Sequence, residues 1–226
     1  MTQVDSTDAI SQGASNLVVW FARHWLAIFN TMWGIYVFLP FLAPILMAAG
    51  LTAPARLIYG VYSIFCHQLP DHSYFLHSHT HELAPSAASL AAGGMPTGLS
   101  LFQERRFIGN TEVGYKVAIC QRDVAIYGSI FLSGLLYALL RERGVGISWK
   151  AAALLTVPMA IDGITQMLGF RESSWWLRSV TGALFGFGAV LFLYPLIQRG
   201  MDDVIYTETK RRQDTPGPKA AEEASG

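Results

Sequence analysis

The chain has 226 residues, of which 52% are hydrophobic and 14% are charged, and its formal net charge is zero. This composition lies outside the range of soluble domains and predicts an integral membrane protein. The absence of a net positive charge argues against a nucleic-acid partner, and two cysteines exclude a disulfide-stapled scaffold while leaving one bridge open.

The first 25 residues are predicted to form an N-terminal segment. Residues 1–22 contain Asp5 and Asp8 but no lysine or arginine, whereas a cleavable signal peptide begins with a basic region. We therefore expect residues 1–25 to be retained, and to be weakly ordered up to about Val18.

Residues 26–199 are predicted to form a transmembrane helical domain. Its strongest helix is expected at residues 26–49, which carry no charge and include Pro40 and Pro44 as expected kinks. Residues 55–69 contain a shorter apolar run. We favour a helix that spans or nearly spans the membrane there, with a re-entrant segment as the alternative.

A polar stretch at residues 69–116 is too rich in proline and glycine for one helix, and its small-residue run at 84–98 predicts a flexible loop. The charged residues 200–226 are expected to form a disordered cytoplasmic tail. The fold class predicted from this order is all-α, a polytopic transmembrane helical bundle with four or five spans. Its last three helices are expected at residues 117–140, 149–170 and 176–198.

Lysines and arginines near the expected spans predict the orientation, because they are enriched in cytoplasmic loops. Positive charges fall between two expected helices and after the last one, at Arg141, Arg143, Lys150, Arg199, Lys210, Arg211 and Arg212. We therefore expect a multi-pass protein of the cell (inner) membrane with a cytoplasmic C-terminus. Residues 69–116 then form an outer loop.

Polar residues recur near the outer ends of the apolar stretches, and Asp162 lies inside one of them. Burying a carboxylate within a membrane span costs free energy, and such a residue is therefore interpreted first as part of a functional site. Alternation of the spans brings these residues to the same side of the bundle, so we expect one polar cluster there. Its members are Cys66, His67, Gln68, Cys120, Arg122, Asp123, Asp162, Gln166, Arg171, Ser173 and Arg178.

The residues of this cluster leave several roles open. Asp162 is interpreted either as an interhelical ion-pair partner of Arg122 or Arg178, or as a group that meets a substrate or ion. The two cysteines fit free thiols, a disulfide, or part of a divalent metal site such as Zn²⁺. In the last case, the expected ligands are Cys66, His67, Cys120 and Asp123.

Two further patterns have simpler interpretations. The loop run His72, His77, His79 and His81 has three histidines at alternate positions. In an extended segment these three would share a face, which invites metal binding, but a solvated loop is the preferred interpretation. The glycines of the last helix, Gly182, Gly186 and Gly188, indicate close helix packing.

Ordered motifs occur over residues 57–190. They are Cys66-His67-Gln68, Pro70, Ser73, Cys120, Arg122, Ile126-Tyr127-Gly128, Asp162-Gly163, Gln166, Arg171, Ser173, Arg178 and Thr181-Gly182. This combination resembles the domain of unknown function 2085, a family of uncharacterised prokaryotic membrane proteins. The resemblance implies a membrane protein and no defined activity. In that family the second motif often has the pattern Cys-x-Arg-Cys, and Asp123 stands here at the second Cys position.

Three functional hypotheses follow. The leading one is a membrane protein whose outer-leaflet polar site binds a metal, a small ion or a lipid head group. The second is a membrane enzyme that acts on a lipid-linked or quinone-like substrate, with Asp162 as base or metal ligand. The third is a structural accessory subunit with a membrane-protein partner. The lipid bilayer is a partner in all three.

Overall fold

The computed structural model describes residues 3–214, and it consists of four long helices and a small α/β unit. The long helices are α1 (Gln3–Ala48), α5 (Gln121–Leu140), α6 (Trp149–Met167) and α7 (Trp175–Asp214). The chain between α1 and α5 forms α2 (Thr52–Tyr62), η1 (Pro70–His72), β1 (Ser73–Leu76), α3 (Ala87–Ala92), α4 (Leu101–Glu104), β2 (Gly109–Asn110) and β3 (Gly114–Cys120). A 3-10 turn, η2 (Arg141–Arg143), follows α5.

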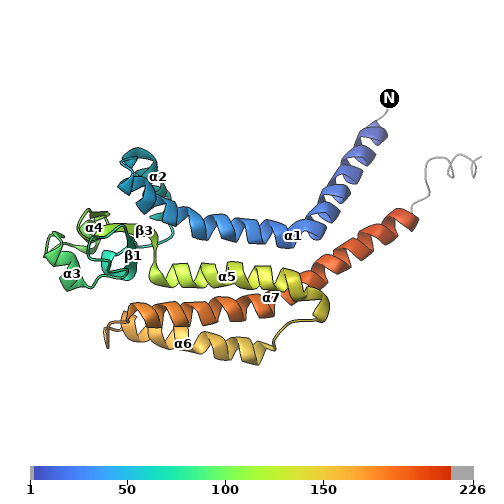
Figure 1. Cartoon of the computed structure of the whole chain (residues 1–226). Coiled ribbons are helices and arrows are strands. Elements are labelled where there is room, and N and C mark those ends of the chain that lie inside the picture. The colour runs from blue at the N-terminus through green and yellow to red at the C-terminus, as the bar shows by residue number, and fades with distance from the viewer. Residues whose placement is uncertain (1–2, 215–226) are drawn as a thin grey trace, which may run out of the picture.

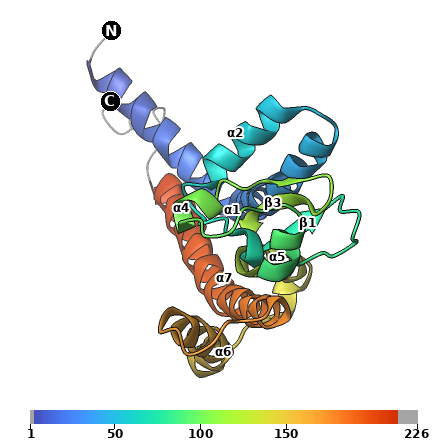
Figure 2. The same ribbon diagram turned by 90° about the vertical axis from the view of Figure 1, so that its left-hand side faces the viewer.

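The four long helices lie side by side, and the sheet and α2–α4 lie together at one end of the bundle (Figures 1 and 2). Helix α7 packs against both α5 and α6. Its glycines permit this close approach. A Cβ atom at Gly182 would lie 3.0 Å from the Arg122 carbonyl oxygen on α5, and one at Gly188 would lie 3.0 Å from the Leu155 Cβ on α6. The predicted glycine packing is therefore confirmed.

Three helices are long and apolar enough to cross a membrane by length and composition: Gln12–Ala48, Gln121–Arg143 and Trp175–Asp214. Helix α6 has 19 residues, but Lys150, Asp162 and Gln166 reduce its hydropathy. It completes a bundle of four helices, of which three are candidate spans among the described residues, whereas the sequence predicted four or five. The preferred span at residues 55–69 is wrong, because α2 has 11 residues and an α-helix of that length covers only about 16 Å.

Apolar side chains cover the outside of the bundle. A soluble protein would bury most of them, whereas a lipid-facing helix exposes them at no cost. The exposed residues on α5 and α6 include Leu132, Leu135, Leu136, Leu139, Leu154, Val157, Ile161 and Ile164.

The small unit is built on an antiparallel sheet with the strand order β1-β3-β2. Phe75, Leu90 and Val113 form its buried core. Residues 69–116 are therefore a folded unit, and α3 lies within the run predicted as a flexible loop. The helix predicted from residue 117 begins at Gln121, because residues 117–120 belong to β3, which is buried against α1 and α2.

The two ends of the described chain are also more ordered than predicted. Helix α1 begins at Gln3 and α7 continues to Asp214, so the structure has helices in the segments predicted to be weakly ordered up to Val18 and disordered at residues 200–214. These two helix ends contact each other, since Ser15 Oγ donates to Glu208 Oε2 at 2.5 Å and Arg212 Nη2 donates to Asn16 Oδ1 at 2.7 Å. The prediction for residues 215–226 lies outside the described residues.

Candidate functional site

Asp162 lies at the centre of a network of ion pairs and hydrogen bonds at the sheet end of the bundle. Its side chain is 1% exposed, and it accepts hydrogen bonds from Arg122 Nη2 at 2.7 Å and Arg171 Nη2 at 2.7 Å. Ser173 Oγ donates a third bond at 2.9 Å. Two guanidinium groups thus compensate one buried carboxylate. Arg122 is one of the two partners that the sequence suggested, and Arg171 takes the place proposed for Arg178.

This network connects three parts of the bundle. Arg122 lies in the first turn of α5, Asp162 near the end of α6, and Arg171 in the link between α6 and α7. Because residues four apart share a helix face, Gln166 also reaches Arg122 and accepts from Nη2 at 3.1 Å. The bonds to Asp162 and Gln166 therefore fix the position of the Arg122 side chain.

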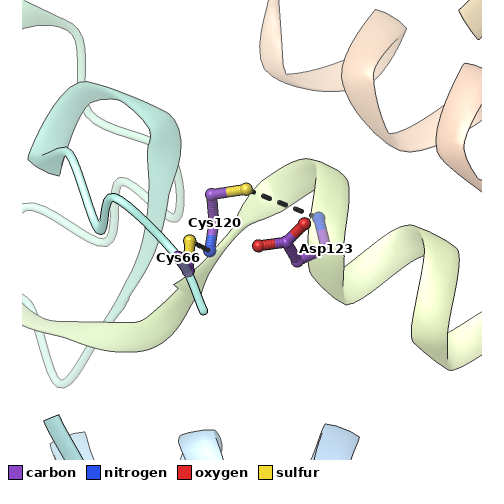
Figure 3. Close-up of side chains that lie close together, drawn as sticks. All are labelled: Cys66, Cys120 and Asp123. Carbon is purple, nitrogen blue, oxygen red and sulfur yellow. Dashed lines mark hydrogen bonds between the residues drawn. The ribbon is translucent and has the colours of Figure 1, made fainter. Parts of the chain in front are cut away.

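Three metal-ligand types meet where β3 passes into α5. The Sγ atoms of Cys66 and Cys120 and a carboxylate oxygen of Asp123 all lie within 4.8 Å of one another (Figure 3). Both cysteines are free thiols. The Cys120 N–H donates to Cys66 Sγ at 3.3 Å, and Cys120 Sγ accepts from the Asp123 N–H at 3.5 Å as the N-cap of α5. The hydrogen bond with Cys66 and burial raise the pKa of Cys120 well above its usual range.

Buried hydrogen bonds fix the segment that carries Cys66. Gln68 has a φ of 52°, and its Nε2 donates to the carbonyl oxygens of Tyr59 at 2.9 Å and Ala118 at 2.8 Å. Lys116 Nζ donates to the carbonyl oxygens of Gln68 at 2.7 Å and Arg105 at 2.6 Å. Lys116 is fully buried, and this burial lowers its pKa to about 7.

A cleft of about 730 Å³ opens beside the three ligand atoms. Its polar lining combines both cysteines with residues of η1, α5, α6 and α7, and its apolar lining includes Phe65, Leu101 and Met167. The polar residues are Cys66, His67, Gln68, His72, Cys120, Arg122, Asp123, Gln166 and Arg178.

The structure divides the eleven residues of the predicted cluster into two groups. Eight of them line the cleft, whereas Asp162, Arg171 and Ser173 form the ion-pair network and do not. His67 lines the cleft but is not among the residues whose ligand atoms lie within 4.8 Å of one another. Gln68 is occupied by backbone bonds and acts as a support.

Three residues of the site lie outside the predicted cluster. His72 lines the cleft, with its Nε2 3.5 Å from Gln166 Nε2. Gln121 accepts a bond from Arg178 Nη1 at 3.3 Å, and Lys116 supports Gln68. The position of His72 directly after the Cys66-His67-Gln68-x-Pro70 motif was a usable signal. No sequence signal distinguished Lys116 from an exposed lysine.

The histidines at alternate positions do not form a site. His77 and His81 have φ angles of 61° and 55°, so the segment is not extended, and all three side chains are exposed. A second ligand group, Asp71, His72 and Glu172, includes an exposed glutamate. Burial lowers the pKa of His72, and Asp71 partly opposes that effect.

Comparison with known proteins yields relatives without a defined activity. The family described as "Predicted membrane protein (DUF2085)" matches residues 103–192, a range that holds Cys120, Asp123 and Asp162 but not Cys66. No solved structure matches this chain.

Two archaeal relatives extend the comparison. An uncharacterized protein of Methanocaldococcus jannaschii is 28% identical over 142 residues, which cover 62% of this chain and 67% of the relative. An uncharacterized protein of Methanothermobacter thermautotrophicus is 36% identical over 75 residues, which cover 33% of this chain and 68% of the relative. The chain belongs to the DUF2085 family of predicted membrane proteins.

Proposed function

We propose that this membrane protein binds a thiophilic divalent metal ion, with Zn²⁺ the best match, through Cys66, Cys120 and Asp123. The main observation behind this proposal is that two sulfur atoms and one carboxylate oxygen lie within 4.8 Å of one another, in residues that line a cleft.

The donor set suits zinc. Zn²⁺ binds thiolates at about 2.3 Å and carboxylates at about 2.0–2.2 Å, usually in tetrahedral geometry. Ligands of such an ion lie about 3.5–3.8 Å apart. Donors that already lie within 4.8 Å of one another reach that spacing through small side-chain rotations. Two sulfur ligands also favour zinc over magnesium or calcium, which prefer oxygen.

Three protein donors leave a fourth position, and the cleft adjoins all three residues. A metal site with three protein ligands and one exchangeable position is the arrangement of reactive rather than purely structural zinc sites. His67 lines the same cleft and is a protein candidate for the fourth position. The carboxylate of Asp123 supplies an oxygen ligand beside the two thiols.

Asp162 has a supporting role in this proposal. It is 1% exposed, is engaged by two arginines, and does not line the cleft. It therefore positions Arg122, rather than serving as the base that an enzyme mechanism would require of it.

The proposal also includes an orientation. The loop that carries Arg141 and Arg143 joins α5 to α6 at the end of the bundle away from the sheet (Figure 1). If these residues are cytoplasmic, as the positive-charge bias indicates, the cleft faces the outer side of the membrane. Both helix ends near the chain termini then lie on the cytoplasmic side.

The metal content of the purified protein tests the proposal. Inductively coupled plasma mass spectrometry on protein in detergent is expected to find about one zinc per chain. Cys66→Ser, Cys120→Ser and Asp123→Asn are each expected to lose most of it, while Asp203→Asn, an exposed carboxylate on α7, retains it. Equal zinc content in all variants would contradict the proposal.

Thiol counting separates the metal from a disulfide. Denatured wild-type protein without reductant is expected to show two free thiols once the metal is chelated. If two thiols appear only after reduction, the cysteines form a bridge and the metal assignment is wrong.

A further inference from the structure

Arg178 is a buried cation without a carboxylate partner. It is 4% exposed, and among residues 3–214 no carboxylate oxygen lies within 4.0 Å of its guanidinium. Its Nη1 donates to the neutral Gln121 side chain at 3.3 Å, and its Nε has no hydrogen-bond partner. A buried, unpaired charge is strongly unfavourable. Binding of an anion would compensate the charge of Arg178.

Arg122 is a second cation whose charge is only partly compensated. Its Nη2 is bonded to Asp162 and Gln166, but its buried Nε also lacks a partner in the described part of the chain. Asp162 is shared with Arg171, so one negative charge faces two positive ones. With Arg178 added, there are three guanidinium groups for one buried carboxylate, which leaves an excess of two positive charges beside the cleft.

Nearby acidic residues do not remove this excess. Asp71 and Glu172 line an adjoining pocket with Arg178, but neither lies in the main cleft. Asp71 is 3.4 Å from His72 Nε2. Asp123 lines the main cleft, beside the two cysteines. The Nε–H groups of the two arginines thus have no hydrogen-bond partner among the described residues.

The donors that converge on the cleft suit a phosphate group. Arg122, Gln166, Arg178 and His72 come from α5, α6, α7 and η1, and all line the cleft. A phosphate presents several oxygens to donors from different directions, whereas a carboxylate presents two in one plane. Guanidinium groups bind phosphate through paired, charge-assisted hydrogen bonds.

The rim of the cleft is apolar. Phe65 and Leu101 are each 66% exposed, and Met167 is 79% exposed, yet all three line the same cleft as the arginines. The volume of about 730 Å³ is much larger than one phosphate needs and falls within the usual range for organic ligands, about 300–1,000 Å³. The cleft therefore combines a cationic base with an apolar edge at the end of a membrane bundle.

We infer that this cleft binds an amphiphile with a phosphate-containing head group, with the phosphate at Arg178 and Arg122 and the chain along Phe65, Leu101 and Met167. The inference does not require the metal, because neither arginine is among the residues of the proposed metal site. Inorganic phosphate would share the arginine contacts but not the apolar ones.

Binding of dihexanoyl-phosphatidylglycerol to the purified full-length protein in a neutral detergent tests this inference. Isothermal titration is expected to show saturable binding, at least tenfold tighter than that of inorganic phosphate. Arg178→Gln is expected to weaken binding of both probes at least tenfold. Arg143→Gln removes the same charge from the other end of the bundle and is expected to leave both unchanged.

A second variant identifies the source of the phosphate. Met167→Ser is expected to weaken lipid binding several-fold without affecting inorganic phosphate, and Leu154→Ser, another exposed apolar residue on α6, is the control. Equal affinity for phosphate and lipid, with no effect of Met167→Ser, would overturn the amphiphile assignment. If Arg178→Gln does not fold, the wild-type and Met167→Ser measurements still decide the question.

The metal and the anion site are separable in the same assay. After chelation of the metal, wild-type protein is expected to retain lipid binding within about threefold, so failure of the metal proposal leaves this result intact. Loss of lipid binding on chelation, or no saturable binding by wild-type protein, would overturn the inference.

Discussion

Arg122 Nη2 donates to Asp162 Oδ2 at 2.7 Å, which joins the first turn of α5 to the last part of α6 behind the cleft. The side chain of Arg122 also lines the cleft. Through this contact the ion-pair network determines the position of a ligand-facing side chain.

Asp162→Asn is expected to destabilise the protein by about 3–5 kcal/mol, because it leaves Arg122 and Arg171 without their shared counter-charge. Chemical unfolding in detergent, followed by circular dichroism, measures the change. Asp203→Asn, which alters an exposed carboxylate on α7, is expected to change stability by less than about 0.5 kcal/mol. Equal stability of the two variants would show that the buried ion pairs do not stabilise the fold.

Gly186→Ala is expected to destabilise the protein by about 1–3 kcal/mol, since overpacking a tight helix contact forces the backbones apart. A Cβ atom there would overlap Ser129 Oγ and the Ile126 carbonyl oxygen of α5. Gly200→Ala lies on the same helix with nothing within 4 Å of its Cβ, so it is expected to be neutral or stabilising by up to about 1 kcal/mol. Thermal unfolding of the pair checks the prediction, which a lower stability of Gly200→Ala would contradict.

The sequence predicted the bundle and the polar cluster better than the unit between α1 and α5. Asp162 was informative because a carboxylate in an apolar stretch needs compensation, and two arginines supply it. The start of α5 was misplaced because an apolar run of three or four residues does not distinguish a buried strand from a helix. In β3 that run, Val117-Ala118-Ile119, is buried by long-range contacts with α1 and α2.

The charged network also depended on contacts that sequence spacing does not reveal. The sequence suggested Arg122 or Arg178 as the partner of Asp162, whereas the structure pairs it with Arg122 and with Arg171 from the link between α6 and α7. Arg178 is turned toward Gln121. Lys116 lies in the stretch predicted as an outer loop, whereas its side chain lies inside the small unit and bonds two backbone carbonyl groups.

The stability of the protein is expected to rise between pH 7 and pH 9 through Lys116. Burial lowers the folded-state pKa of Lys116 to about 7 from 10.5, so in this window the unfolded chain binds more protons and stability increases with pH. Wild-type protein is expected to gain about 2 kcal/mol more than Lys116→Met over this range. Unfolding curves at both pH values measure the difference, and identical pH dependence would contradict the buried, neutral lysine.

The orientation predicts which side of the membrane is reached by a membrane-impermeant maleimide. In a Cys66→Ser/Cys120→Ser background, a cysteine introduced at the exposed Leu83 of the small unit is expected to react in intact cells. One introduced at Arg143, at the other end of the bundle, is expected to react only after permeabilisation. The reverse pattern would place the cleft on the cytoplasmic side.

The coordination shell of the bound metal tests the central claim most directly. Zinc K-edge X-ray absorption of the purified protein is expected to show two sulfur ligands at about 2.3 Å and oxygen or nitrogen ligands at about 2.0–2.2 Å. Cys120→Ser is expected to reduce the sulfur count or abolish binding. A shell that contains only oxygen and nitrogen would contradict the assignment of Cys66 and Cys120 as metal ligands.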